Sequence, residues 1–155
     1  MQERMRTHRL TGEQVEGLLG SARIGHLGTF GRDGYPYVIP VHYVYLDGVI
    51  YFHGLNRGQK LDNIGANPNV CFQVTGGFSL IQADAPCETN TAYRSVVCLG
   101  KAFLVEDAAE KARVLDAVVA KYTPQHRGRA FPGEALEVTA VVGIRPGELH
   151  GKHYP

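Results

Sequence analysis

Six runs of strand-forming residues, most of them joined by short turn signals, are the feature that most limits the folds open to this chain. The runs are rich in Val, Ile, Tyr and Phe, and several alternate apolar with polar residues, which is typical of half-buried strands. Asp47-Gly48, a two-residue hairpin signal, separates two of them. The predicted strands cover residues 24–30, 35–45, 49–53, 70–74, 93–105 and 137–144.

Helices are expected around these strands. Thr11 and Gln14 have the spacing of a capping box, residues 58–66 follow a glycine-rich loop, and Asp107 precedes an apolar helical stripe. The pattern predicts a mainly β fold with peripheral helices, arranged as a six-stranded, closed or nearly closed antiparallel barrel. Side chains fill a barrel of this size, so a cofactor would lie outside it or between two barrels.

Composition excludes several classes of protein. A length of 155 residues indicates one domain over residues 1–155, and a net charge of +1 gives no reason to expect nucleic acid or a membrane as a partner. Residues 1–6 lack an apolar signal core and no run is long enough to span a membrane, so we expect a cytoplasmic protein. Cys71, Cys87 and Cys98 are too few and too widely spaced for a disulfide framework, and we expect reduced thiols.

Residues 52–63 carry the clearest chemical signal. A strand ends at His53, a loop with Gly54, Arg57 and Gly58 follows, and a helix begins. Amides at a helix start attract anions, glycines allow close approach, and Arg57 and Lys60 add positive charge, so the segment suits a phosphate group. The alternative is an ordinary strand-to-helix connection with two solvated cations. The segment is neither a P-loop nor a GxGxxG motif.

Pro40 interrupts the predicted strand 35–45. Proline cannot donate a hydrogen bond to a neighbouring strand, so its position predicts a sheet edge or a bulge. A backbone group freed there could meet a ligand, although a simple edge strand explains the pattern equally well. His150 and His153 form an HxxH pair without a carboxylate or cysteine ligand in register, which we interpret as a flexible tail, and no metal site is expected.

Several segments in a fixed order resemble the pyridoxamine 5′-phosphate oxidase-like, FMN-binding split-barrel superfamily, and most closely its nitroimidazole-resistance flavoproteins. The matching segments are residues 34–41, 50–54, 58–64, 67–68, 87–96 and 100–102. The resemblance implies a split β-barrel homodimer with FMN in each of two interface clefts. It assigns cofactor contacts to the backbone of Val38, Ile39, Pro40 and Val41, to His53, Gly58 and Lys60 with Arg57 nearby, and to Ser95 from the partner subunit.

The resemblance also implies an FMN-dependent oxidoreductase that reduces small aromatic or nitro-aromatic compounds, with electrons from NAD(P)H or another donor. His53 is then the candidate catalytic residue, as a proton donor or substrate anchor. A half-buried structural histidine is the alternative for His53. For the whole chain the alternatives are a non-catalytic protein that stores or senses FMN, or a relative that binds haem or a deazaflavin. The chain lacks the C-terminal arginine segment of the vitamin B6 oxidase, so pyridoxamine phosphate is not expected as its substrate.

Overall fold

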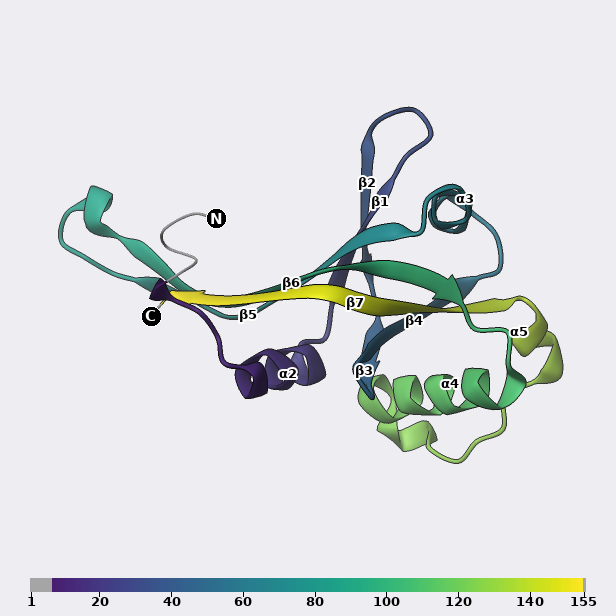
Figure 1. Cartoon of the computed structure of the whole chain (residues 1–155). Helices are drawn as coiled ribbons and strands as arrows, with labels where there is room; N and C mark the ends of the chain where they lie inside the picture. The colour runs from purple at the N-terminus through teal and green to yellow at the C-terminus, as the bar shows by residue number, and fades with distance from the viewer. Residues whose placement is uncertain (1–6, 155) are drawn as a thin grey trace.

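Within residues 7–154, which the computed structural model describes, seven strands pair in the order β2-β1-β5-β6-β7-β4-β3 (Figure 1). Every pair is antiparallel, and the sheet is of the split-barrel type that the sequence predicts. Residues 1–6, which enter the prediction about a signal segment, lie outside the described residues. The strands are β1 Gly25–Phe30, β2 Pro36–Val41, β3 Tyr43–Leu46, β4 Val49–Leu55, β5 Asn69–Ile81, β6 Asn90–Leu104 and β7 Thr139–Tyr154.

The helices lie outside the sheet, and two of them are capped as the sequence predicts. The Thr11 hydroxyl accepts a hydrogen bond from the Gln14 amide (3.2 Å) and the Gln14 side chain accepts one from the Thr11 amide (2.9 Å), while the Asp107 carboxylate accepts one from the Glu110 amide (2.7 Å). The helices are α2 Gly12–Ser21, α3 Gln59–Ala66, α4 Ala108–Tyr122 and α5 Gly133–Glu137, with short 3₁₀ turns η1 Pro86–Glu88 and η2 Pro124–His126.

The prediction of one strand over residues 35–45 is wrong. The structure has two strands here, and they lie at the two ends of the sheet. The chain breaks at His42 into β2 and β3, which pair with β1 and β4 at the two ends of the sheet. Pro40 faces His26 in the β1 ladder and has no N–H to offer a second neighbour, so β2 suits an edge. The barrel therefore has seven strands instead of six, with a split between β2 and the β3–β4 hairpin.

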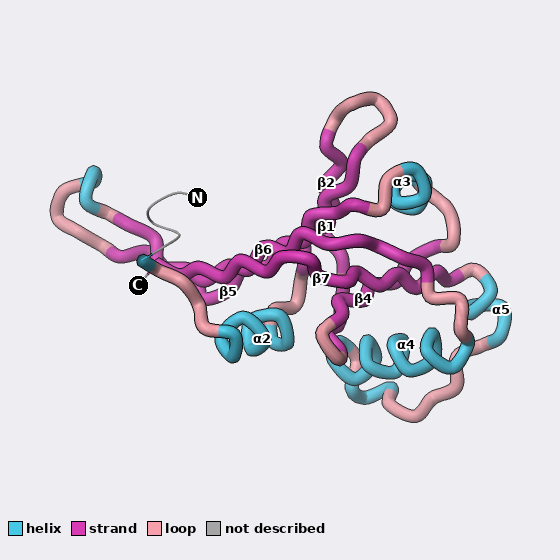
Figure 2. The backbone as a smooth tube through the Cα atoms, viewed as in Figure 1, coloured by secondary structure: helices cyan, strands magenta, loops and turns pink. Residues whose placement is uncertain are grey.

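Two predicted strands are also too short. β5 continues to Ile81 and pairs with β6 past an irregularity between Gly76 and Ser79, which makes the long arm on the left of Figures 1 and 2. β7 begins at Thr139 and runs to Tyr154, so the predicted flexible tail at residues 150–153 is wrong. β6 provides a full-length partner for this segment, and pairing satisfies backbone groups that a free tail would leave to water.

Two apolar cores hold the helices to the sheet. The first fills the barrel and includes Leu19 of α2 and Phe52 of β4, while the second lies between α4 and the outer surface of β3, β4 and β7. Successive residues of β4 contribute to them in turn, because strand side chains alternate between faces. Tyr51 belongs to the α4 core and Phe52 to the barrel core. This alternation also decides where the next residues, His53 and Gly54, point.

Candidate functional site

The loop between β4 and α3 is held by the chain that enters β7. The Asn56 amide donates to the carbonyl oxygen of Val138 (2.9 Å), and the Asn56 side chain donates to the carbonyl oxygen of Glu137 (3.0 Å). Gly58 then turns the chain with φ of 123°, a conformation that strains any other residue, and nothing lies within 4 Å of the position of a Cβ atom. The loop therefore presents open backbone immediately before α3.

The start of α3 has the properties of an anion site. No side chain of the described residues caps this helix, and the amides of Leu61 and Asp62 bond to the Gly58 carbonyl at 2.9 and 3.2 Å. The amides before them have no intrahelical acceptor, because a helix leaves its first N–H groups unpaired. Together with the positive end of the helix dipole, these amides favour a negatively charged group in front of Gly58 and Gln59.

Helix α3 is fixed to β1 by a buried hydrogen bond. The Asn63 side-chain amide donates to the Thr29 hydroxyl at 3.0 Å, and both side chains are buried. Ile64, the next residue, packs in the barrel core. A buried polar pair of this kind is costly to break, so it holds α3 against β1.

Lys60 bends back from α3 over the end of β4. A Cβ atom built on Gly54 would lie 2.6 Å from the Lys60 Nζ atom, so the ammonium group occupies the space that a side chain at Gly54 would need. Lys60 is half-buried, whereas Arg57 is exposed. Gly58, Lys60 and Arg57 thus lie within four residues of one another at the start of α3, and the Lys60 ammonium reaches back to Gly54.

His53 lies on the other face of β4. It follows Tyr51 in the alternation, so it points toward α4, whereas Gly54 and the Lys60 ammonium lie on the barrel side. There it lines a hollow of about 560 Å³ between the sheet and α4. We call this space the α4 hollow, and its lining includes Arg23, His42, His53, Val119, Tyr122 and Phe131.

The His53 ring has an unused polar atom. Its Nδ1 atom is buried and has no hydrogen-bond partner among the described residues. Burial lowers the pKa of His53, and the neighbouring His42 and Lys60 lower it further. Burial therefore favours the neutral form of the His53 ring.

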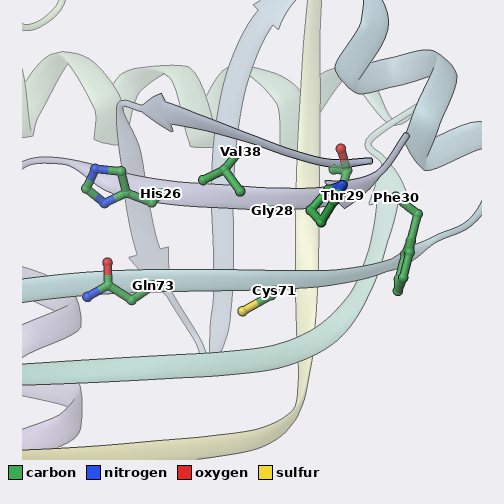
Figure 3. A pocket seen from close by; sticks show the side chains of 8 residues that line it. His26, Gly28, Thr29, Phe30, Val38, Cys71 and Gln73 are labelled. Carbon is green, nitrogen blue, oxygen red and sulfur yellow. The ribbon is translucent and has the colours of Figure 1, made fainter. Parts of the chain in front are cut away.

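The predicted contact residues on β2 lie along a free sheet edge. β2 pairs only with β1 in the described sheet, so one row of its backbone groups faces the split. Ile39 and Val41 pack against the barrel core, while Val38 and Pro40 belong to the opposite face. Val38 lines a hollow of about 530 Å³ with residues of β1 and β5, including Cys71 and Gln73 (Figure 3).

Ser95 is far along the sheet from this loop. It lies on β6, where it faces Thr75 of β5 and Lys152 of β7, and it is buried. Gly54, which the Lys60 ammonium approaches, pairs with Ala140 of β7, just beyond the pairing of Val142 with Leu104 of β6, and Leu104 is nine residues from Ser95, or about 30 Å along the strand. One copy of the chain therefore does not bring Ser95 to Lys60.

The sequence did not single out Tyr122 or Arg23, which help to build the α4 hollow. The Tyr122 ring stacks on His42 with centroids 4.4 Å apart, and the Arg23 guanidinium lies 5.3 Å from the centre of the Tyr122 ring. Tyr122 fits the apolar stripe of its helix, so periodicity gave no sign of a second role. Its position, directly before a helix-ending Thr-Pro pair, was the available signal.

Comparison with known proteins agrees with this fold. The chain matches the sequence profile of the pyridoxamine 5′-phosphate oxidase family over residues 11–153. The fold therefore defines an antiparallel split-barrel protein with helices at its periphery. The chain belongs to the pyridoxamine 5′-phosphate oxidase family. Comparison with curated protein sequences finds no match.

Solved structures share the fold over most of the chain. A protein of Bacteroides thetaiotaomicron described as a candidate 5-nitroimidazole antibiotic resistance protein is 25% identical, with a TM-score of 0.81 over 92% of this chain and 84% of that one. The flavocytochrome Anf3 of Azotobacter vinelandii is 25% identical, with a TM-score of 0.87 over 100% and 72%. An FAD- and haem-binding protein of Mycobacterium smegmatis shares the fold at 21% identity, with a TM-score of 0.82 over 92% and 71%.

No helix among the described residues combines the length and the apolar character that crossing a bilayer requires.

Proposed function

We propose that this protein is an FMN-binding oxidoreductase that reduces small aromatic or nitro-aromatic compounds. The observation that carries the proposal is the Gly58 turn before an uncapped α3, whose second residue, Lys60, extends its ammonium group over Gly54 at the end of β4. Membership in the pyridoxamine 5′-phosphate oxidase family and similarity to a flavocytochrome support a flavin as the ligand. Similarity to the candidate nitroimidazole-resistance protein supports the substrate class.

The residues of the loop fit a phosphate monoester. Lys60 supplies a positive charge on a stem that β4 supports through Gly54, and the exposed Arg57 adds a forked donor. The amides at the start of α3 donate to phosphate oxygens without any side-chain competitor from the described residues. β2 is an edge strand, and in this proposal its backbone groups from Val38 to Val41 contact the rest of the mononucleotide.

A second copy of the chain would complete the site. The face that carries Val38 also exposes Phe30 and Leu99, which are 60% and 45% exposed, and one ladder row joins Val38, Gly28, Cys71 and Leu99. An apolar sheet face of this kind suits burial against an identical face. We propose a homodimer across it, with Ser95 of the other copy approaching the cofactor.

The flavin, when bound, supplies the electron-transfer chemistry, and the residues of this chain supply position and polarity. We propose His53, which lines the α4 hollow beside apolar residues of α4, as the polar group that orients the substrate. NAD(P)H or another donor would provide the electrons.

The direct test is to identify the small molecule that the purified protein releases on denaturation. We expect FMN in the released fraction and a yellow protein with flavin absorbance. We also expect oxidation of NAD(P)H to be coupled to the loss of a nitroimidazole. Release of haem, a deazaflavin or no chromophore would contradict the proposed cofactor. FMN without coupled turnover under any donor would contradict the proposed reaction and favour storage or sensing.

A further inference from the structure

The end of the β5–β6 hairpin, residues 77–92, is a bare two-stranded ribbon, which we call the arm. β7 reaches only to Tyr93, so beyond this residue the described strands β5 and β6 pair with each other alone. Neither apolar core includes a residue of the arm, and its Phe78 and Leu80 are 71% and 57% exposed. Because an isolated two-stranded ribbon is marginally stable in water, the arm requires a surface to pack against.

The arm is also acidic. Residues 77–92 include Asp84 and Glu88, both exposed, and no lysine, arginine or histidine. Neither carboxylate forms an ion pair within the described chain. The arm therefore fits a surface that combines apolar area with positive charge.

The segment that follows α4 has the opposite charge. Residues 121–130, which we call the basic segment, contain no acidic residue and expose Arg127 and Arg129, for which the described chain provides no carboxylate partner. Lys121 adds little to this exposed charge, because its Nζ atom is buried over the Tyr43 ring and burial lowers its pKa to about 8. Figure 1 shows the arm at one end of the molecule and α4, with the basic segment after it, at the other. The two segments can therefore meet between copies and not within one copy.

A hollow between α4 and the basic segment suits the apolar side chains of the arm. Its volume is about 410 Å³, and small apolar side chains form much of its wall. The lining consists of Asp116, Ala117, Val119, Ala120, Arg127 and Gly128.

We propose that in the homodimer the arm of each copy docks on the basic segment of the partner copy. Phe78 enters the hollow beside α4, and the carboxylates of Asp84 and Glu88 lie against the guanidinium groups of Arg127 and Arg129. Twofold symmetry makes the contact reciprocal, so each dimer contains it twice and no arm is left bare.

This inference rests on the homodimer of the proposed function, and it gives the partner copy a part in the substrate site. Tyr122 and Thr123 belong to the basic segment and also line the α4 hollow beside His53. An arm docked on the basic segment therefore stands at the rim of the α4 hollow and bounds the space that the substrate enters.

Cross-linking tests which surface the arm contacts. The native Cys87 is exposed beside Glu88 near the tip of the arm, and Gln125→Cys places a second thiol on the basic segment without changing its charge. With a short bis-maleimide and flavin-free protein, we expect Gln125→Cys to give several times more covalent dimer on a denaturing gel than the parent protein. Adding Cys87→Ser should remove the increase. Glu106→Cys, exposed at the other end of α4, is the matched control and should give no increase.

Dimer affinity, measured by sedimentation equilibrium, tests the two kinds of contact. Phe78→Ser should weaken the dimer by at least about tenfold, because apolar area is lost in both copies of the contact. Leu104→Ser, at an exposed residue at the far end of β6, should change it less than about twofold. Glu88→Arg should weaken the dimer by at least about fivefold, and Arg129→Glu in the same chain should restore most of the loss.

A cross-link yield no higher than that of Glu106→Cys would overturn the inference, as would unchanged dimer affinity in Phe78→Ser and Glu88→Arg, and the arm would then serve a different partner. A chain that stays monomeric would overturn it together with the proposed homodimer. Cross-linking needs no flavin, so a protein that cross-links as expected but releases no FMN would count against the proposed cofactor alone.

Discussion

The Tyr122 hydroxyl lies 2.9 Å from the backbone nitrogen of Tyr43 and 2.8 Å from the carbonyl oxygen of the same residue. It also lies 2.8 Å from the carbonyl oxygen of Arg23. Since β3 is an edge strand, this one side chain takes the place of a neighbouring strand at its first residue. Tyr122 thereby ties the end of α4 to the split of the barrel and to the segment before β1.

The first prediction concerns this hydroxyl. Tyr122→Phe keeps the ring and its stacking on His42 but leaves the Tyr43 amide without its partner, so we expect the free energy of unfolding to fall by about 1–3 kcal/mol. Urea denaturation measures the change. Tyr35→Phe, at a side chain that is 75% exposed, is the control and should stay within about 0.5 kcal/mol of the parent protein. Equal stabilities of the two variants would show that Tyr122 does not hold β3.

The second prediction concerns Lys121. Its pKa falls from an ordinary 10.5 to about 8 in the folded protein, so the unfolded chain binds more protons between these values. Lys121 therefore makes stability rise as the pH increases from about 8 to 10.5 and lowers stability at neutral pH. Lys121→Met keeps an apolar contact with the Tyr43 ring. We expect it to raise the free energy of unfolding at pH 7 by about 1–2 kcal/mol, after allowance for solvent screening.

Other groups titrate in the same pH range, so the free energy of unfolding is compared between the Lys121→Met variant and the parent protein at each pH. Burial raises the pKa of Cys98 to about 11 and also raises that of Tyr43, which lowers stability at alkaline pH in both proteins. The stability gained through Lys121→Met should shrink toward zero between pH 8 and 10.5. A difference that is independent of pH would show that the Lys121 amine is not desolvated.

The third prediction compares two glycines of the phosphate loop and its helix. Gly58→Ala places a side chain at φ of 123° and should cost about 1–3 kcal/mol of stability, with a loss of FMN affinity. Gly65→Ala lies within α3 in open space and should stabilise the helix by about 0.5–1 kcal/mol. Thermal unfolding and FMN titration of both variants check the prediction. Similar effects of the two substitutions would contradict the described loop conformation.

Local patterns predicted most of the fold. The hairpin at Asp47-Gly48, the box at Thr11 and the glycine before α3 each depend on residues close in sequence, and the structure has all three. The break at His42 was missed because Val, Ile and Tyr continue across it. β2 and β3 are distinct strands because they pair with different neighbours: β2 pairs with β1, and β3 pairs with β4.

Only those parts of the candidate site that are formed by residues close together in the sequence were predictable. Gly58 and Lys60 are two residues apart in sequence, and the structure brings Lys60 to Gly54. The face toward which His53 points depends on the register of β4 and on the packing of α4, which comes more than fifty residues later. For the same reason, the sequence did not reveal that Arg23 and Tyr122 line the same hollow as His53.

The central claim is that the loop before α3 and Lys60 hold the terminal phosphate of FMN. Parallel titrations of the flavin-free protein with FMN and with riboflavin, which lacks the phosphate, measure this most directly. We expect FMN to bind at least about tenfold more tightly, and Lys60→Ala to remove most of that difference by weakening FMN alone, in line with charge-assisted hydrogen bonds. Lys101→Ala, at an exposed lysine of β6, should leave it unchanged. Equal affinities for FMN and riboflavin, or full FMN affinity in Lys60→Ala, would contradict the account.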